Sequence, residues 1–253
     1  MTAMGFSFEL TGRTALITGA SSGLGTRFGR ILAVSGAKVA LGARRIDRLE
    51  EIADRIGANA CAVQMDVARE ADIIAGFDAA EAAFGPVDTV IANAGVDGAG
   101  MATTISEDEI EHTLAVNLKG AILTAREGVK RMMAHGVTNG RIVLVASITA
   151  FEPSPGLVAY AASKAGVVQA GRTMAREWAR SGINVNTISP GYIRTAINDA
   201  WFETEPGKKQ IARFPKRRLM DEQGLDAMML FLCSDASEFV TGTDFVLDDG
   251  QTL

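Results

Sequence analysis

The chain has 253 residues, of which 47% are hydrophobic and 22% are charged, and its formal net charge is −5 at pH 7. Positive and negative residues are scattered along the chain, which argues against the basic face that binding to nucleic acid or to an anionic membrane requires. Two cysteines, Cys61 and Cys233, are too few for a disulfide scaffold and fit a reducing cytosol, and the zinc-binding spacings CxxC and HExxH do not occur, so no metal site is expected.

The amino-terminal residues and the hydropathy pattern give no sign of export or membrane insertion. Residues 1–8 contain neither the basic nor the apolar region of a secretory signal. The longest uncharged apolar stretch, Ile142 to Phe151, is about half as long as a membrane-spanning helix. We therefore expect a cytoplasmic protein without membrane contact, in which residues 1–8 are flexible.

Short apolar runs alternate with longer amphipathic stretches along the chain. The expected strands are Thr14–Thr18, Lys38–Ala43, Ala60–Gln64, Thr89–Ala92, Arg141–Ala146, Asn184–Ser189 and Phe245–Leu247. The expected helices are Gly23–Ser35, Asp47–Ile56, Glu70–Phe84, Ser106–His135, Val158–Ser181 and Asp221–Cys233. Because the strands are continuous apolar runs, both faces of the sheet should be covered. The alternation predicts one domain over residues 1–253, an α/β Rossmann-type doubly wound parallel sheet of about seven strands with helices on both faces.

A glycine-rich turn, TGASSGLG at Thr18–Gly25, follows the first expected strand and leads into the first helix. Glycine lets the backbone approach a pyrophosphate closely, and the free N–H groups and the dipole at the helix start attract its charge. A dinucleotide site is therefore expected at this turn, although a plain tight turn has a similar composition. The candidate contacts in the turn are Gly19, Ser21, Ser22, Gly23, Leu24 and Gly25.

Two other motifs overlap this turn and fit the chain poorly. A Walker loop has Lys followed by Ser or Thr after its last glycine, whereas Thr26 and Arg27 follow here. The segment GASSG also matches G-x-S-x-G, the nucleophile turn of α/β-hydrolases, which need a histidine downstream of an acid. Both histidines, His112 and His135, lie within one expected helix in the middle of the chain.

The end of the second expected strand bears on the choice between NAD and NADP. An NAD site carries Asp or Glu there to bind the ribose 2′-hydroxyl, but here Ala43 is followed by Arg44 and Arg45. Guanidinium groups bind a 2′-phosphate through charge-assisted hydrogen bonds, so NADP(H) is favoured over NAD(H). The nearby acid Asp47 forms the pattern Asp47-x-x-Glu50, which resembles a helix capping box and indicates a structural role.

Tyr160 and Lys164 stand four residues apart in an expected helix, which places them on one helix face. Ser147 directly follows an expected strand, at the sheet edge where ligands bind. Lowering a phenol pKa from about 10 to about 7 takes roughly 4 kcal/mol, and a cation about 4 Å away in an effective dielectric near 20 supplies about that much. Lys164 is therefore sufficient to activate Tyr160, although a packed Tyr beside a solvated Lys is the commoner explanation of such a pair taken alone.

The combined motifs resemble the short-chain dehydrogenase/reductase family from about Thr11 to the carboxyl terminus. In the family's order and spacing stand the glycine turn, Asn93-Ala94-Gly95, Asn117, Ser147, Tyr160-x-x-x-Lys164 and Pro190-Gly191. The chain departs from the family at Ala92, where the family often has Asn. We expect little effect, because Asn93 remains to tie the sheet together.

The resemblance implies a role for each residue near the reacting carbonyl group. Tyr160 is expected to act as general acid in reduction and as general base in oxidation, and Ser147 to hydrogen-bond the substrate oxygen. Lys164 is expected to bind the nicotinamide ribose and to lower the pKa of Tyr160. Asn117 is expected to hold a water that passes the proton to solvent.

The same resemblance implies further cofactor contacts. Asp66 and Val67 match the family's adenine contact, and Ile193 and Thr195 match its contacts to the nicotinamide carboxamide and the pyrophosphate. Asp66 could instead cap a helix, and Thr195 could be an ordinary loop residue. Beside the glycine turn and the two arginines, the expected cofactor-binding residues are Asp66, Val67, Asn93, Ala94, Gly95, Tyr160, Lys164, Pro190, Gly191, Ile193 and Thr195.

Residues 191–220 form an unusually long connection after the sixth expected strand, which we interpret as a substrate lid in preference to a surface insertion. The residues expected around the carbonyl group are mostly apolar, which suggests a ketone or aldehyde with hydrophobic substituents. The expected substrate contacts are Ser147, Ala150, Phe151, Tyr160, Trp201 and Phe202.

Two other functions stay open at this point. The family includes 3-oxoacyl-[acyl-carrier-protein] reductases, whose basic contacts are matched by Lys130, Arg131 and Arg176, although solvated surface charge explains these residues as well. Further basic residues around the lid are Lys208, Lys209, Arg213, Lys216, Arg217 and Arg218. A non-catalytic nucleotide-binding protein would require loss of the Tyr160–Lys164 pair, and both residues are present.

Two of the expected helices also suggest self-association. Ser106–His135 and Val158–Ser181 are long, and the second is rich in Ala and Gly along one side. Family members commonly associate through these two helices. The resemblance therefore implies a homotetramer that acts on a small-molecule carbonyl or alcohol substrate and has no nucleic-acid partner.

Overall fold

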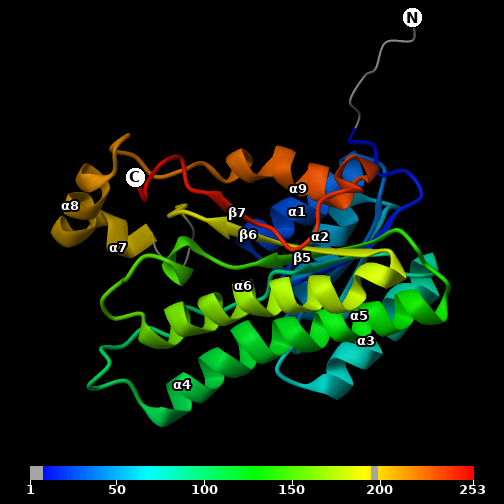
Figure 1. Ribbon diagram of the computed structural model, residues 1–253, viewed down its shortest axis with the longest axis horizontal. Helices are drawn as coiled ribbons and strands as arrows, with labels where there is room; N and C mark the ends of the chain where they lie inside the picture. Colours follow the sequence, from blue (N-terminus) through cyan, green and yellow to red (C-terminus); the bar gives the residue numbers. More distant parts are fainter. Residues whose placement is uncertain (1–7, 195–198) are drawn as a thin grey trace, which may run out of the picture.

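The computed structural model describes residues 8–194 and 199–253, and its seven strands form one parallel sheet in the order β3-β2-β1-β4-β5-β6-β7 (Figure 1). The strands are β1 (Thr14–Thr18), β2 (Lys38–Ala43), β3 (Ala60–Gln64), β4 (Thr89–Ala92), β5 (Gly140–Val145), β6 (Ile183–Pro190) and β7 (Asp244–Leu247). Four strands have the predicted bounds, and β5, β6 and β7 differ by one residue at one or both ends. The predicted α/β parallel sheet is confirmed.

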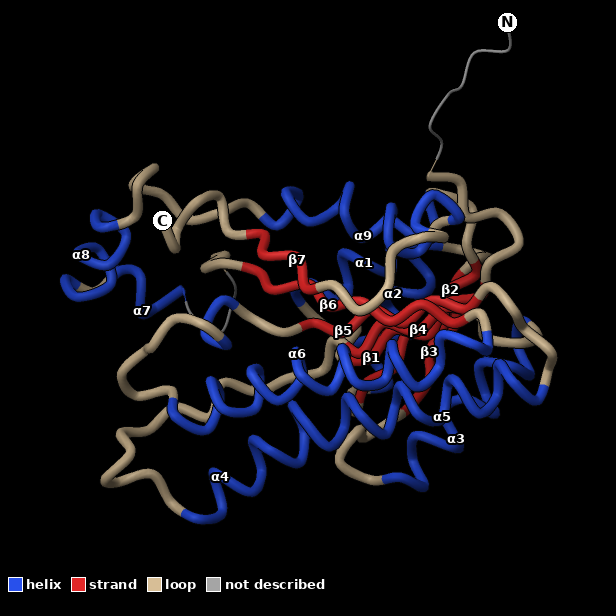
Figure 2. The backbone as a smooth tube through the Cα atoms, viewed as in Figure 1, coloured by secondary structure: helices blue, strands red, loops and turns tan. Residues whose placement is uncertain are grey.

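Helices cover both faces of the sheet, as continuous apolar strands predict (Figure 2). The helices on one face are α1 (Gly23–Val34), α2 (Ile46–Ile56) and α9 (Asp226–Cys233), and those on the other are α3 (Glu70–Phe84), α5 (Gly120–Ala134) and α6 (Val158–Trp178). Each face has its own hydrophobic core. The first core contains Phe28 and Leu232, and the second contains Phe77 and Val167. Two cores on one sheet leave the strand ends as the place where functional residues can gather.

The predicted helix Ser106–His135 is divided in the structure. It consists of α4 (Glu107–Leu114), a π-helical turn (Ala115–Lys119) and α5. Ser106 is the N-cap of α4, since its side chain accepts a hydrogen bond from the Glu109 N–H at 3.2 Å. The π-helical turn falls at Asn117, one of the predicted site residues.

Short 3₁₀ turns accompany several helices. They span Ile148–Ala150, Ala179–Ser181, Glu222–Leu225 and Asp235–Ser237. The predicted helix Asp221–Cys233 therefore starts with a 3₁₀ turn before α9, and the last residues of the predicted Val158–Ser181 are a 3₁₀ extension of α6. Among the helices of the described residues, none combines the length and the apolar character needed to cross a membrane.

The capping box predicted at Asp47 is wrong. Helix α2 begins at Ile46, so Asp47 lies inside its first turn, and the residue in the N-cap position is Arg45, which makes no side-chain cap hydrogen bond. Asp47 instead places negative charge near the helix start, where the dipole favours it. Asp47 therefore acts on α2 through its charge and not through a capping hydrogen bond.

Two short helices lie within residues 191–220, and neither is predicted from the sequence. They are α7 (Asp199–Glu203) and α8 (Glu205–Arg213). The Thr204 side chain caps α8 by accepting a hydrogen bond from the Gly207 N–H at 3.2 Å, and Pro206 lies in the first turn. Figure 1 shows α7, α8 and the carboxyl terminus together at one end of the molecule.

Candidate active site

The predicted site residues leave the sheet at one edge, at the carboxyl ends of the parallel strands. The glycine turn follows β1, Asn93 follows β4, Ser147 follows β5 and Gly191 follows β6. Strands β1 and β4 are neighbours in the sheet, and the strand order reverses between them. Ligands of doubly wound sheets bind in the crevice at such a point. Folding thus brings residues from four parts of the chain to one crevice.

The glycine turn is packed too tightly for side chains at two of its positions. Gly19 has a φ of +69°, and a Cβ there would lie 2.8 Å from the Cα of Ala94. A Cβ on Gly25 would lie 2.4 Å from the carbonyl oxygen of Gly19. The N-cap residue of α1, Ser22, makes no side-chain cap hydrogen bond, so the first N–H groups of α1 have no side-chain acceptor there. These features fit the binding of a pyrophosphate.

Asn93 joins the glycine turn to β4. Its Nδ2 donates to the carbonyl oxygen of Thr18 at 2.9 Å. The backbone N–H groups of Asn93 and Ala94 donate to Thr18 Oγ1 at 3.0 and 3.1 Å. The expectation that Asn93 ties the sheet together is therefore confirmed, and Ala92 is buried in the core.

Arg45 reaches the glycine turn from the end of β2. Its Nη2 donates to Ser21 Oγ at 2.9 Å and to Ser22 Oγ at 3.3 Å. Arg44 is exposed, and its carbonyl oxygen accepts a hydrogen bond from Gln64 Nε2 at 3.4 Å. The structure thus places one guanidinium group on the serines of the turn and leaves the other facing outward.

A cavity of about 410 Å³ opens beside the turn, between α1 and α2. Four arginines line it: Arg27, Arg30, Arg48 and Arg55. Arg27 is neutralised by Asp226, whose Oδ1 lies 2.6 Å from its Nε, and this pairing raises the pKa of the guanidinium. Arg30 and Arg55 make no ion pair within the described residues, so the cavity offers positive charge to an anion.

Ser147, Tyr160 and Lys164 meet between β5 and α6. Ser147 stands before the 3₁₀ turn Ile148–Ala150, where its Oγ accepts a hydrogen bond from the Thr149 N–H at 3.2 Å, and it lies near enough to Tyr160 to oppose the rise in the pKa of the phenol. Lys164 is 4% exposed, and its Nζ donates to the carbonyl oxygen of Val145 at 2.8 Å. The ammonium lies 5.6 Å from the centroid of the Tyr160 ring. The predicted pair is therefore close together, on one helix face.

The pKa values in this cluster differ from the prediction made for Tyr160. Burial raises the pKa of the phenol, the hydrogen bond with Ser147 opposes that shift, and Tyr192 and Asp97 add to it. Burial also lowers the pKa of Lys164 to about 8. The expected lowering of the Tyr160 pKa by Lys164 is thus not met, because the ammonium is directed at the Val145 carbonyl and the phenol is desolvated.

The side chain of Asn117 holds the loop after β4. Its Oδ1 accepts from the Val96 N–H at 2.8 Å, and its Nδ2 donates to the Val96 carbonyl oxygen at 2.9 Å and to Ser163 Oγ at 3.1 Å. A Cβ on Gly95 would lie 3.4 Å from Asn117 Oδ1 and 3.6 Å from Lys164 Nζ. Asn117 Oδ1 and Lys164 Nζ therefore both border the space next to the Cα of Gly95.

Asp66 and Val67 lie between β3 and α3. Asp66 Oδ1 accepts a hydrogen bond from the Ala68 N–H at 3.0 Å, so it caps the turn that precedes α3, not the helix itself. Val67 is buried, and its Cγ2 lies 2.8 Å from where a Cβ on Gly120 would be. The pair stands at the same sheet edge as the glycine turn, two strands further out.

The segment after β6 is braced against the last strand. Pro190 ends β6, and the Gly191 N–H donates to the Leu247 carbonyl oxygen at 2.9 Å. Ile193 is buried and pairs with Met220 in an isolated parallel bridge. Thr195, a predicted cofactor contact, lies outside the described residues, as do the amino-terminal residues 1–7.

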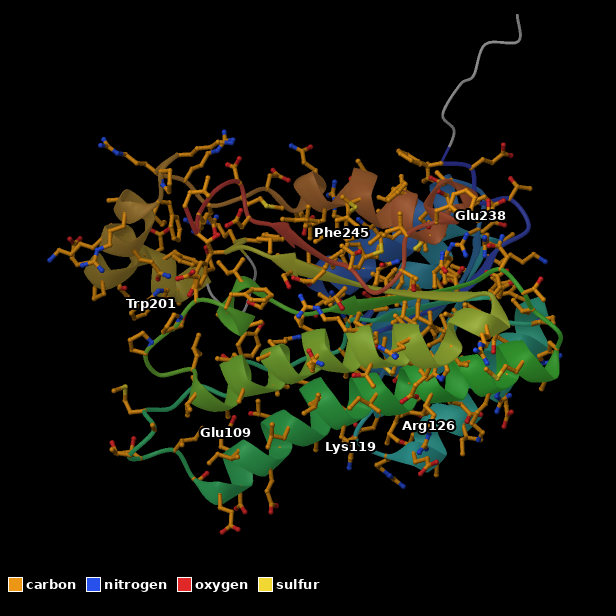
Figure 3. The ribbon with its side chains drawn as sticks, in the orientation of Figure 1. Glu109, Lys119, Arg126, Trp201, Glu238 and Phe245 are labelled. Atoms are coloured by element: carbon orange, nitrogen blue, oxygen red, sulfur yellow. The ribbon has the colours of Figure 1, made fainter. Side chains whose placement is uncertain are left out.

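The predicted substrate contacts differ in exposure. Phe151 and Trp201 are 49% and 48% exposed, and Trp201 Nε1 donates to Gln210 Oε1 at 2.9 Å. Trp201 lies at the end of the molecule that carries α7 and α8 (Figure 3). Ala150 is partly buried beside the second core. Phe202 is only 1% exposed, so it offers no surface to a substrate and packs into the protein instead.

Three residues without a predicted role, Asp97, Ser154 and Tyr192, lie in the loops after β4, β5 and β6, at the same sheet edge as Ser147. Tyr192 and Asp97 both lie within electrostatic reach of the Tyr160 phenol. The hydroxyl groups of Tyr192 and Ser154 lie 3.1 Å apart and are hydrogen-bonded. One signal was available, since Tyr192 is one of two tyrosines and directly follows Pro190-Gly191. Ser154 and Asp97 carry no such signal, because their position depends on how the loops fold. Within the described residues, no cluster of three or more His, Cys, Asp or Glu side chains could hold a metal ion.

Comparisons with a family model, with related sequences and with solved structures all identify dehydrogenases or oxidoreductases as similar to this chain. Residues 13–206 match the family model described as short chain dehydrogenase. The chain is 36% identical over 256 residues to the oxidoreductase UcpA of Salmonella typhimurium, covering 97% of this chain and 96% of that protein. It is 35% identical over 251 residues to D-threitol dehydrogenase of Mycolicibacterium smegmatis, covering 98% and 96%. It is also similar to the crystal structure of a gluconate 5-dehydrogenase from Burkholderia cenocepacia in complex with NADP and tartrate, with a TM-score of 0.91, 32% identity and 97% of each chain covered.

Proposed function

The chain belongs to the short-chain dehydrogenase family and is an oxidoreductase for alcohol or carbonyl substrates, and from this premise we propose that it is an NADPH-dependent carbonyl reductase. In the reverse direction the same site acts as an alcohol dehydrogenase. The observation that carries the proposal is the meeting of Ser147 and Tyr160 with the buried ammonium of Lys164, which lies 5.6 Å from the centroid of the Tyr160 ring.

Each residue of the cluster has a task in this reaction. NADPH, when bound, supplies the hydride that the carbonyl carbon accepts. Tyr160 donates its phenol proton to the substrate oxygen as negative charge develops there, and Ser147 donates a hydrogen bond to the same oxygen. Lys164, whose ammonium lies 5.6 Å from the centroid of the Tyr160 ring, is assigned to the nicotinamide ribose. Asn117 and Lys164 border the space at Gly95, where a water returns the proton to Tyr160.

Charge around the glycine turn supports NADP(H) over NAD(H). Arg45 lies on Ser21 and Ser22, and arginines line the adjoining cavity. Arg44 is exposed at the end of β2, where a carboxylate would bind a free 2′-hydroxyl. We assign the 2′-phosphate to Arg44 and Arg45. Thr195 keeps its proposed contact to the cofactor, and Asp66 and Val67 keep theirs to adenine.

The test is a measurement of initial rates with NADPH and with NADH over a panel of ketones and aldehydes. We expect carbonyl-dependent oxidation of NADPH, with kcat/KM for NADPH at least about tenfold higher than for NADH. Binding of NADPH without turnover of any carbonyl compound would contradict the proposed activity. Equal efficiency with both cofactors would contradict only the cofactor preference.

Reduction of 3-oxoacyl groups on acyl carrier protein is the second candidate, and the charges favour it less. Arg131 and Lys130 both bind Glu127, at 2.8 and 3.1 Å. Lys216 binds Asp249 near the carboxyl terminus. A basic surface for an acidic carrier protein needs unpaired cations. Comparing simple ketones with acetoacetyl thioesters separates the two functions.

The proposal extends to the arrangement of the protein in the cell. We propose that residues 1–253 act as one domain, with residues 191–220 as a lid over the substrate. α7 and α8 lie beyond the end of β6, which supports that role. We propose a cytoplasmic homotetramer, as expected from the resemblance.

A further inference from the structure

The hydrogen-bonded pair of Ser154 and Tyr192 stands beside the reacting groups and has no part in the proposed proton transfer. Ser154 belongs to the loop that joins the Ser147 turn to α6, and Tyr192 follows β6. Both side chains are partly exposed. Their oxygen atoms lie 3.1 Å apart. Two polar groups are therefore held together in the loops after β5 and β6, where the sequence predicts mostly apolar substrate contacts.

Packing fixes the direction of the Tyr192 ring. Phe214 stacks on it with ring centroids 5.8 Å apart, and Phe202 meets it edge-on at 6.0 Å. The backbone is held as well, because Gln251 accepts from the Tyr192 N–H at 2.7 Å and donates to its carbonyl oxygen at 3.0 Å. Because two aromatic rings contact the Tyr192 ring and Gln251 binds its backbone, the Tyr192 hydroxyl is held in one position. Such preorganisation is what a specificity group requires.

Asp97 adds a carboxylate to the same side. Its loop is joined to the Ser154 loop, since the Gly100 N–H donates to the Gly156 carbonyl oxygen at 2.8 Å. Asp97 is exposed and makes no ion pair within the described residues. Asp97 and Tyr192 both raise the pKa of Tyr160, which indicates that both lie near its phenol. Three loops, after β4, β5 and β6, thus each contribute one polar group.

We propose that Ser154, Tyr192 and Asp97 form a subsite that binds a second hydroxyl group of the substrate, so that the substrate class is neutral hydroxyketones and the corresponding diols. This inference rests on the proposed carbonyl reductase activity and narrows its substrate.

The hydrogen-bonding capacity of the subsite matches a hydroxyl group. The two hydroxyls of the pair share one hydrogen bond, which leaves one O–H donor and several lone pairs. A substrate hydroxyl can accept from that donor and donate to a lone pair or to the Asp97 carboxylate. A substrate carboxylate would be repelled by the Asp97 carboxylate, because both groups carry negative charge. Neutral polyhydroxylated compounds are therefore preferred over hydroxy acids.

The test compares hydroxyacetone, methoxyacetone and acetone as substrates of the NADPH-loaded enzyme. Methoxyacetone keeps the electron-withdrawing oxygen but cannot donate a hydrogen bond. We expect Tyr192→Phe and Ser154→Ala each to lower kcat/KM for hydroxyacetone about 3- to 10-fold and to leave acetone within about twofold. Tyr192→Phe keeps the ring that packs on Phe202 and Phe214. Thr173→Val, which removes a hydroxyl from the exposed side of α6, is the matched control. It should leave kcat/KM unchanged for both hydroxyacetone and acetone.

A second experiment tests the negative charge of Asp97. Asp97→Asn should raise kcat/KM for hydroxypyruvate about tenfold while hydroxyacetone changes less. A wild-type enzyme that uses hydroxyacetone no better than methoxyacetone overturns the subsite. So does an equal loss for all three ketones in Tyr192→Phe, which would mark a purely structural role.

A third measurement separates this inference from the proposed function. In the presence of NADP⁺, 1,2-propanediol should raise the unfolding temperature of the wild type more than 2-propanol does, and Tyr192→Phe should lose that difference. If no ketone is reduced, the proposed function fails, and the diol-specific shift still decides whether the subsite exists. Equal shifts with both alcohols overturn it.

Discussion

Tyr160 is the residue at which the proposed chemistry can be tested most directly. Replacing it by Phe removes one oxygen atom, the proton donor to the substrate, and keeps the ring. We expect Tyr160→Phe to lower kcat for ketone reduction by at least about 10²-fold, the usual contribution of a general acid. Titration of NADPH fluorescence should show a Kd within about threefold of the wild-type value. Substantial turnover by Tyr160→Phe would refute the role of the phenol.

The buried ammonium of Lys164 makes stability depend on pH in a defined direction. Its pKa is about 8 in the folded protein and 10.5 in the reference state, so the unfolded chain binds more protons between these values. The free energy of unfolding therefore rises with pH between about pH 8 and 10.5. Below about pH 8, Lys164 does not change it with pH. Relative to Lys164→Met, the wild type should gain up to about 3 kcal/mol in unfolding free energy from pH 8 to 10.5.

Urea denaturation of both proteins at pH 7.5, 9 and 10.5 measures this difference. Lys164→Met should show no corresponding rise, because it has lost the titrating group. A constant difference between the two proteins over the window would show that the ammonium is not desolvated in the folded state.

The two arginines after β2 are expected to contribute unequally to cofactor choice. Arg45 already bonds the serines of the glycine turn, whereas Arg44 is free to move toward a 2′-phosphate. We expect Arg44→Asp to lower kcat/KM for NADPH about 10- to 100-fold and to raise it for NADH, since a carboxylate repels phosphate and binds a hydroxyl. Arg126→Ala is the control, because Arg126 lies on α5, away from the cavity between α1 and α2, and pairs with Glu70 at 2.5 Å. An unchanged NADPH to NADH ratio in Arg44→Asp would refute the assignment.

At the scale of single elements, the glycine turn and the start of α1 leave little room for a side chain. Ala favours a helix over Gly by about 1 kcal/mol, so propensity alone predicts that Gly25→Ala stabilises α1. The added Cβ would instead lie 2.4 Å from the Gly19 carbonyl oxygen, which is backbone and cannot rotate away. We expect Gly25→Ala to cost about 1–3 kcal/mol of stability and to weaken NADPH binding at least about tenfold.

Thermal unfolding and a binding titration check this expectation. Gly224→Ala serves as the comparison, since its Cβ would meet only the flexible end of Met220 at 3.1 Å. A Gly25→Ala protein as stable as Gly224→Ala would show that the turn can relax.

The regular elements can be predicted from the sequence where one physical requirement dominates. Strands that are buried on both faces need continuous apolar runs, and such runs mark their ends to within one residue. The π-helical turn at Ala115–Lys119 could not be predicted, because one extra residue in a helical turn barely changes the amphipathic pattern. Helices α7 and α8 are short and polar, and Phe202 and Phe214 hold them to Tyr192 through contacts between distant residues.

The same limit applies to the candidate site. Tyr160, Lys164 and Ser147 could be found because their spacing is local or tied to a strand end. The direction of the Lys164 ammonium and the raised pKa of Tyr160 could not, since both depend on desolvation after folding. Ser154 and Asp97 belong to loops whose meeting is set by backbone hydrogen bonds between them.

At the scale of the whole molecule, exposed apolar side chains bear on the number of subunits. Apolar side chains in the segment before β7, in β7 itself and at residue 253 face outward, with Phe239 92%, Val246 46% and Leu253 97% exposed. Such residues are commonly covered by another subunit. We expect light scattering to give about four times the 26.6 kDa chain mass. A mass near that of a single chain would contradict the proposed homotetramer.

The brace between Gln251 and Tyr192 has a practical consequence for how the enzyme is handled. Residues 248–253 lie beside α7 and α8 (Figure 1), and Gln251 holds both backbone polar groups of Tyr192. A purification tag fused after Leu253, or trimming by a carboxypeptidase, would therefore act on substrate preference as well as on yield. Libraries that aim to change that preference can therefore include positions 248–253.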